Sequence, residues 1–340
     1  MVNKQQIISN QRIIDSLNTD YGINCATLDL LPLGADLDSC VYKAASPDGS
    51  VFFVKIKRGQ NHNIGAIIQQ LLHDAGIQQI IPPVNTKYGQ PTQYIDGCTI
   101  VIYPFIEGQD GFSRDLTNDQ WVTLGKALRQ IHEFELPPLI KNQIKCETYS
   151  PKWRQSIKSI YNYIDSQPIM INEIALKLFT FMQAHREIIQ RLTNRAEQLA
   201  QKIQIQSSEF VLCHSDIHGG NVLMTDMGNF YIVDWDQPIM APKERDLMFI
   251  GGGIANAWNN PQEEMLFYKG YGKTEINREI LTYYRHERIV EDIAIYCQHL
   301  FLTKDGEDNR TEIYDIFTAM FKPHGVVDIA FKTDNEFTNI

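Results

Sequence analysis

The sequence predicts an α+β protein with two lobes: a small N-terminal lobe on an antiparallel sheet, and a larger, mainly helical C-terminal lobe carrying one β-hairpin. Strand-like runs surround a single helix in the first hundred residues, whereas helical patterns dominate after Gly108. We place the lobes at residues 1–106 and 107–340, with a connector at about 103–111. A chain of 340 residues is long enough for two lobes of this kind.

The N-terminal lobe is predicted from two strands and one helix. Residues 51–57 are rich in β-branched and aromatic side chains and follow turn-forming residues at 47–49. Apolar residues at i, i+3, i+4, i+7 and i+8 predict a helix over 64–72, and Gly76 is well placed to end it. A second strand is expected over 99–103.

The C-terminal lobe begins with a helix start signal. Thr117 and Gln120 fit a capping box, and apolar residues at helical spacing follow them. A second long helical stretch is expected from about 174 to 203. Two short strands interrupt this pattern between 210 and 234, and helices resume after them.

Composition limits the kinds of partner and the cellular compartment that we expect for this protein. The chain has 31 Lys and Arg against 41 Asp and Glu, a net charge of −10, which disfavours nucleic acid and anionic membranes and mildly favours a cationic partner. The six cysteines are scattered without a CxxC pair, as is typical of reduced proteins. The first residues lack the apolar core of a signal peptide, and no apolar run approaches a membrane span. We therefore expect a soluble, cytoplasmic protein.

The most informative polar residues lie in the segment 210–236. A two-residue turn at 227–228 would place Asn221 directly opposite Asp234, with both side chains on one face. Asp216 lies on the loop that enters the hairpin. An amide oxygen and a carboxylate suit Mg²⁺, and a third oxygen-bearing group can serve the reacting hydroxyl. The pattern therefore predicts phosphoryl transfer, which depends mainly on positioning and charge neutralisation.

This segment has two other possible interpretations. An ordinary surface hairpin could use the same polar residues to cap its turns. Cys213, His214 and His218 could instead bind zinc, since the two histidines have i, i+4 spacing. Gly219 and Gly220 follow at once and make a helix there unlikely, and the glutamate of an H-E-x-x-H motif is missing. Phosphoryl transfer is the stronger interpretation.

The stretches 214–221 and 232–236 resemble the signature of the aminoglycoside phosphotransferase and choline kinase family, a branch of the protein-kinase-like fold. The similarity covers nearly the whole chain. It implies a Mg²⁺-dependent kinase that uses ATP or GTP. Further blocks resemble the spectinomycin phosphotransferase subgroup: residues 150–154, 241–253 and 283–294.

The resemblance implies roles for individual residues. It makes Asp216 the catalytic base and Asn221 and Asp234 the Mg²⁺ ligands. His214 would brace the catalytic loop, and Lys55 would hold the α- and β-phosphates of the nucleotide.

The nucleotide side of the site is predicted from the first lobe. Phe53 alternates with Lys55, so both project to one face of their strand, and Lys57 on that face is interpreted as an ordinary solvated lysine. The turn 33–39 could lie over the phosphates, with Ser39 offering a hydroxyl, although a simple strand-to-strand turn fits equally well.

The connector 103–106 lies where kinase-like folds bind adenine through the backbone. Tyr103 begins it. Pro104 has no N–H, so Phe105 or Ile106 must supply the donor. A rigid linker is the alternative interpretation.

Lys55 departs from the kinase pattern. Kinases pair this lysine with a helix glutamate, yet no acidic residue occurs between Lys55 and Asp74. Lys55 must be held by another group, such as Asp74 or Asp234, or its phosphate contact is weakened. The departure favours a nucleotide-binding pseudokinase, whereas intact Asp216 and Asn221 favour an enzyme.

The acceptor is less sharply defined. Glu287 and Glu291 share a helical face and could bind a cationic aminocyclitol, although an ion-paired face with neighbouring arginines fits as well. Trp235 and Asp236 adjoin the predicted metal site and could contact either substrate. The resemblance therefore carries the acceptor hypothesis, which is antibiotic resistance by O-phosphorylation of spectinomycin. A metabolite kinase for choline, homoserine or a thiosugar is the alternative.

Overall fold

The computed structural model describes residues 7–32, 38–59, 63–168, 170, 172–205, 208–252, 254, 257–302 and 307–338. The chain divides into two compact units. The first comprises Met1–Lys145 and His214–Ile239, and the second comprises Cys146–Cys213 and Met240–Ile340.

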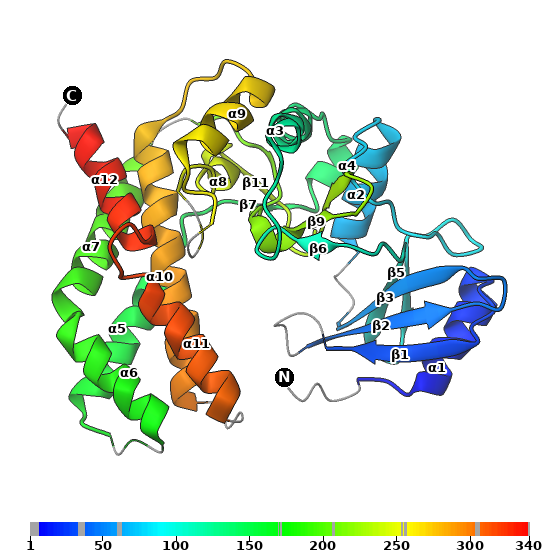
Figure 1. The fold of residues 1–340 in the computed structure, drawn as a ribbon, viewed down its shortest axis with the longest axis horizontal. Coiled ribbons are helices and arrows are strands. Elements are labelled where there is room, and N and C mark those ends of the chain that lie inside the picture. The colour runs from blue at the N-terminus through cyan, green and yellow to red at the C-terminus, as the bar shows by residue number, and fades with distance from the viewer. Residues whose placement is uncertain are drawn as a thin grey trace. The chain divides into compact units, whose positions relative to one another are not determined.

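The first unit is built on an antiparallel sheet, to which the described residues contribute five strands in the order β1–β2–β3–β5–β4 (Figure 1). The strands are β1 (Thr27–Leu31), β2 (Ser39–Ala45), β3 (Val51–Arg58), β4 (Thr92–Ile95) and β5 (Cys98–Pro104). In the central strand β3, Val54 and Ile56 are buried in the core. Because side chains alternate along a strand, Phe53, Lys55 and Lys57 project from the other face, as predicted.

The helix α1 (Asn10–Ser16) and the π-helical turn η1 (Leu17–Tyr21) complete this core. The unit also contains α2 (Ile64–Asp74). Ile13 and Leu17 pack into the same core as Val54 and Ile56. The predicted end of α2 is confirmed: Gly76 has a φ of 89°, and glycine accepts this left-handed conformation at a helix end without strain.

The rest of the first unit contains the hairpin and the elements around it. Its elements are β6 (Gln109–Asp110), α3 (Asn118–His132), α4 (Pro138–Lys141), the 3₁₀ turn η2 (Gly219–Asn221), β9 (Val222–Met224) and β10 (Phe230–Ile232), with a sheet order of β10–β9–β6. The predicted capping box is confirmed, because Thr117 and Gln120 exchange hydrogen bonds at 2.8 and 3.3 Å. Gln120 Nε2 also donates to the Gly228 carbonyl at 3.0 Å, which ties α3 to the hairpin turn.

The second unit is mainly helical, and α10 contacts α5, α7 and α12 (Figure 1). Its elements are α5 (Lys152–Asp165), α6 (Glu173–Ala184), α7 (Arg186–Ile203), β8 (Val211–Cys213), α8 (Glu244–Leu247), α9 (Pro261–Tyr271), α10 (Arg278–Leu302), α11 (Glu307–Ala319) and α12 (Val326–Thr338). A further sheet has the order β7–β11–β8, with β7 at Lys145–Cys146 and β11 at Ile239–Ala241. Ile289, Ile293 and Cys297 of α10 are buried in the core of this unit.

The predicted long helix over 174–203 is instead two helices, α6 and α7. The break falls at His185, which has a φ of −102° and a ψ of 11°. Its ring stacks on Phe181, with centroids 3.8 Å apart, and Nδ1 lies 3.0 Å from the Phe181 carbonyl oxygen. The imidazole therefore covers the last turn of α6 where the backbone leaves the helix.

The α+β class with an antiparallel sheet and many helices is confirmed. The lobe boundary at residues 106 and 107 stays a prediction. The two compact units are divided differently, since they group the hairpin with the N-terminal sheet. Among the helices described, none is both long enough and apolar enough to cross a bilayer.

Candidate active site

The hairpin that carries the predicted metal ligands turns over three residues. Thr225 N–H donates to the Asn229 carbonyl at 2.8 Å, and Val222 pairs with Ile232. Gly228 closes the turn with a φ of 86°, a conformation that glycine adopts readily. The predicted two-residue turn was therefore wrong, and the strand register shifts by one residue.

This register separates Asn221 from the position directly opposite Asp234. Val233 N–H donates to the Asn221 carbonyl at 2.9 Å, so Val233 is the cross-strand neighbour of Asn221. The predicted face-to-face pair was wrong for this reason. Asp234 follows directly, with a φ of 64° that is uncommon outside glycine and that turns the chain out of the strand.

Asp216 and Asn221 lie together on the loop before β9. Asn221 Nδ2 donates to the main-chain oxygen of Asp216 at 2.8 Å and lies 3.3 Å from its Oδ2. Since the amide nitrogen faces Asp216, the amide oxygen is the atom that can ligate a cation. The Asp216 side chain is 42% exposed, so a substrate can reach its carboxylate.

His214 connects this loop to the hairpin. Its Nδ1 accepts a hydrogen bond from the Asp216 N–H at 3.3 Å. In the neutral imidazole the proton is therefore on Nε2, which donates to the Val233 carbonyl at 2.9 Å. The indole of Trp235 packs edge-on against the imidazole at 4.7 Å. The bracing role of His214 stays a prediction.

His218 is a further residue of the site that the sequence indicated only as a zinc ligand. Its Nδ1 accepts from the Gly220 N–H at 3.1 Å, and its Nε2 lies 3.4 Å from Asp216 Oδ2. The ring stacks on Phe112, with centroids 5.5 Å apart. His218 therefore steadies the carboxylate of Asp216. In the sequence, the feature that could have indicated this contact was the position of His218 two residues after Asp216.

Gly219 matters because another backbone approaches it closely. Gly111 N–H donates to the Gly219 carbonyl at 2.8 Å, and a Cβ on Gly219 would lie 3.0 Å from backbone atoms of Gly111. The glycine thus allows the residue after β6 to pack against the loop that carries Asp216.

Lys55 is held by two carboxylates of the hairpin. Its Nζ lies 2.7 Å from Asp234 Oδ1 and 2.7 Å from Asp236 Oδ1. Burial works to lower the pKa of Lys55, but the two carboxylates outweigh it and raise the pKa. Of the two partners anticipated, Asp234 contacts Lys55, whereas Asp74 accepts from Gln70 at 2.8 Å.

Lys57 is not the solvated lysine that was expected. Its Nζ lies 3.1 Å from Asp236 Oδ2, and its side chain is largely buried. Burial works to raise the pKa of Asp236, but Lys55 and Lys57 lower it below the usual value.

The connector narrows the choice of an adenine donor. Phe105 N–H donates to the Val51 carbonyl at 3.0 Å, which continues the pairing of β3 and β5. Of the two predicted donors, Phe105 therefore has its N–H engaged with β3, and the adenine contact of Ile106 stays a prediction.

Tyr103 and Phe53 lie beside this connector. The Tyr103 hydroxyl donates to Gln69 Oε1 at 2.6 Å, and its ring is tilted against Phe53 with centroids 6.4 Å apart. Ser39 is buried at the start of β2. Most of the predicted phosphate turn, residues 33–37, lies outside the described residues. The nucleotide roles of Tyr103, Phe53 and Ser39 stay predictions.

Residues 29–272 match the profile of the phosphotransferase enzyme family. The chain belongs to this family. It is 44% identical to spectinomycin phosphotransferase APH(9)-Ia, solved with ADP and spectinomycin, with a TM-score of 0.88 over 97% of this chain and 99% of that one. It is 22% identical over 247 residues to Protein StrN of Streptomyces griseus, covering 71% of this chain and 75% of that protein. Choline kinase LicA of Streptococcus pneumoniae, 16% identical over 92% of this chain and 98% of that one with a TM-score of 0.55, shares the fold.

The predicted family is thus confirmed, and the chain is a small-molecule kinase. In this phosphotransferase, Trp235 is only 2% exposed, and its Nε1 donates to the Ile232 carbonyl at 3.1 Å. Its burial and its contact with His214 indicate a packing role, while substrate contacts by Trp235 and Asp236 stay predictions.

The predicted acceptor residues lie on α10 in the second unit of the phosphotransferase. Glu287 is only 6% exposed and pairs with the guanidinium of Arg154. Burial raises the pKa of Glu287 to about 7, against the opposing effect of Arg154. Arg154 also donates to Glu197 at 2.7 Å and to the Tyr149 carbonyl at 3.0 Å. Acceptor binding by Glu287 and Glu291 stays a prediction.

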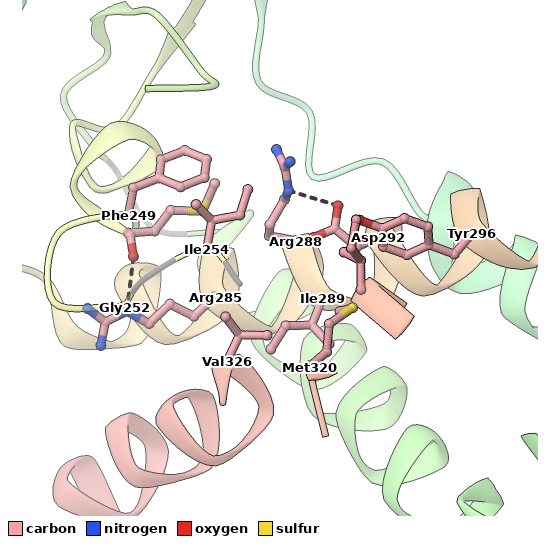
Figure 2. A pocket seen from close by; sticks show the side chains of 12 residues that line it. Phe249, Gly252, Ile254, Arg285, Arg288, Ile289, Asp292, Tyr296, Met320 and Val326 are labelled. Carbon is pink, nitrogen blue, oxygen red and sulfur yellow. Dashed lines mark hydrogen bonds and ion pairs between the residues drawn. The ribbon is translucent and has the colours of Figure 1, made fainter. Parts of the chain in front are cut away.

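Figure 2 shows the side chains that line a cavity in the second unit of the phosphotransferase. The volume of this cavity is about 70 Å³. Its wall is largely apolar, and its charged groups contact protein atoms: Arg285 Nε donates to the Met248 carbonyl at 3.3 Å, and Arg288 lies 3.0 Å from Asp292. Ligand pockets usually measure about 300–1,000 Å³, and this cavity falls well below that range.

Proposed function

We propose that this phosphotransferase moves the γ-phosphate of ATP to a hydroxyl of spectinomycin or a closely related aminocyclitol, with Mg²⁺ as its cofactor. The observation that carries the proposal is the 44% identity, over 97% of the chain, with a phosphotransferase solved with ADP and spectinomycin. The net charge of −10 also suits a cationic acceptor. Because ATP is the donor, the expected compartment is the cytoplasm.

Asp216 is the proposed general base. Its exposed carboxylate takes the acceptor hydroxyl's proton while the hydroxyl oxygen attacks the γ-phosphorus. The bond from that phosphorus to the oxygen bridging to the β-phosphate breaks, and ADP leaves. Asn221 Nδ2 and His218 Nε2 lie 3.3 and 3.4 Å from Asp216 Oδ2 and would keep the carboxylate oriented before transfer.

Asn221 and Asp234 are the residues that would hold Mg²⁺. Both offer oxygen atoms, which Mg²⁺ prefers, and the Asn221 amide nitrogen is already turned toward Asp216. The Asp234 side chain is 49% exposed, so one of its oxygens can reach a ligand. When bound, the metal neutralises charge on the triphosphate. Lys55 would contact the α- and β-phosphates, and the N–H of Ile106 would donate a hydrogen bond to a ring nitrogen of adenine.

A missing helix glutamate for Lys55 is the feature that favours a pseudokinase. The hairpin supplies two carboxylates at 2.7 Å instead, so the lysine is positioned.

The proposal is tested by incubating the protein with γ-labelled ATP, Mg²⁺ and an acceptor panel of spectinomycin, other aminocyclitols, choline, homoserine and a thiosugar. We expect labelled spectinomycin, with a kcat/KM at least about 100-fold above that for choline or homoserine. A higher kcat/KM for choline, homoserine or the thiosugar would identify a metabolite kinase. No labelled product with any acceptor would contradict the proposed function.

A further inference from the structure

Asp236 bridges two lysines that project from one face of β3. Its Oδ1 lies 2.7 Å from Lys55 Nζ, and its Oδ2 lies 3.1 Å from Lys57 Nζ. Because the lysines are two residues apart on a strand, one carboxylate can contact both. The Asp236 side chain is 30% exposed, compared with 49% for Asp234. Asp236 is therefore the more enclosed of the two carboxylates at Lys55.

Helix α2 supplies no carboxylate for Lys55. In kinases generally, a glutamate on the corresponding helix forms this pair. Here Asp74 is the acidic residue of α2, and it lies at the far end of the helix, where it contacts Gln70. At the start of α2, Gly65 packs on the main-chain carbonyl of Trp235. Thus α2 contacts the segment 234–236 through the backbone, and the segment itself provides the carboxylates.

We infer that Asp236 is the positioning residue for Lys55, in the place that the helix glutamate takes in other kinases, and that Lys57 orients Asp236. This inference rests on the proposed function. Asp234 also contacts Lys55, but a carboxylate that ligates Mg²⁺ has its charge largely neutralised and attracts an ammonium less strongly. Asp236 keeps Lys55 in place in that state. Lys55, Lys57 and Asp236 together carry a charge of +1, which suits a polyphosphate.

The test is the Asp236→Asn variant, which keeps the shape of the side chain and removes its charge. We expect MgADP binding, measured by calorimetry, to weaken about tenfold, because a charge-assisted contact that orients the lysine is lost. Asp236→Glu should recover part of the affinity, and Lys57→Met should give a smaller loss. The matched control is Asp226→Asn, at a hairpin-turn residue whose side chain is 99% exposed, and it should bind MgADP like the wild type.

A second measurement separates positioning from a general structural defect. Without Mg²⁺, Asp234 still holds Lys55, so Asp236→Asn should weaken ADP binding less in EDTA than in Mg²⁺. An equal loss in both conditions, or binding indistinguishable from Asp226→Asn, would overturn the inference.

The binding experiment is independent of the acceptor. If the wild type phosphorylates nothing, the proposed function fails, while calorimetry of Asp236→Asn against Asp226→Asn still decides the role of Asp236.

Discussion

Gly65 of α2 lies directly against the main-chain carbonyl of Trp235, so that a Cβ on Gly65 would come within 1.9 Å of that oxygen. No side chain fits at this distance, so the contact depends on glycine. Trp235 separates Asp234 from Asp236, the two carboxylates that hold Lys55. The packing of α2 and the position of Lys55 are therefore linked through one short segment.

Gly65→Ala should destabilise the protein although alanine is the better helix former. Helix propensity alone would stabilise α2 by up to about 1 kcal/mol. The clash with the Trp235 carbonyl should instead lower the free energy of unfolding by about 1–3 kcal/mol, the usual cost of overpacking. Urea denaturation measures the change. A raised midpoint would show that α2 does not pack on this carbonyl in solution.

Asp216→Asn should abolish most turnover while leaving nucleotide binding intact. The amide cannot accept the hydroxyl proton, so kcat should fall by at least about 100-fold. The affinity for MgADP should stay within about threefold of the wild type. Steady-state kinetics and calorimetry test both parts, with Asp226→Asn as the control. An unchanged kcat would exclude Asp216 as the base.

Chelation of divalent metal should stop phosphate transfer, and added Mg²⁺ should restore it. Asn221→Ala removes one proposed ligand, so the Mg²⁺ concentration for half-maximal activity should rise about tenfold, equivalent to about 1.4 kcal/mol. Titrating Mg²⁺ at saturating ATP measures this shift. The same half-maximal concentration in both proteins would show that the Asn221 oxygen is not a ligand.

Arg154→Met should destabilise the protein most at alkaline pH. The variant leaves Glu287 buried without its cationic partner, which typically costs about 3–5 kcal/mol. Burial already raises the pKa of Glu287 to about 7, and loss of Arg154 removes the effect that lowers it. Folding therefore favours the protonated form, so stability falls as pH rises through the raised pKa.

The measurement for Arg154→Met is denaturant unfolding at pH 6 and pH 8. The loss relative to the wild type should be larger at pH 8, and Arg154→Met with Glu287→Gln should show a smaller loss and less pH dependence. Equal losses at both pH values would mean that Glu287 does not titrate in the folded protein.

Some features of the fold and of the site could be predicted from the sequence because they depend on contacts between residues close together in the chain. The capping box at Thr117 and the glycine end of α2 each involve contacts within a few residues, so spacing and residue type sufficed. The spacing of Asp216 and Asn221 on one short loop likewise brought their side chains together, with Asn221 Nδ2 3.3 Å from Asp216 Oδ2.

The strand register depended on details that a pattern does not contain. A turn of two or three residues fits the same apolar spacing, and the left-handed conformation of Gly228 selected three. The predicted adenine donor was ambiguous for a similar reason: the sequence does not distinguish Phe105 from Ile106, whereas in the fold the N–H of Phe105 donates to the Val51 carbonyl of β3.

Residue patterns were enough to predict the α+β class, the phosphotransferase family and the loop that carries Asp216. The groups that hold Lys55 became identifiable only in the folded protein, because they lie 179 and 181 residues away in the chain. The pairing of Glu287 with Arg154 was likewise visible only there. Ion pairs of this kind depend on how separate elements pack against one another. Residue periodicity, in contrast, indicates only which face of each element is buried.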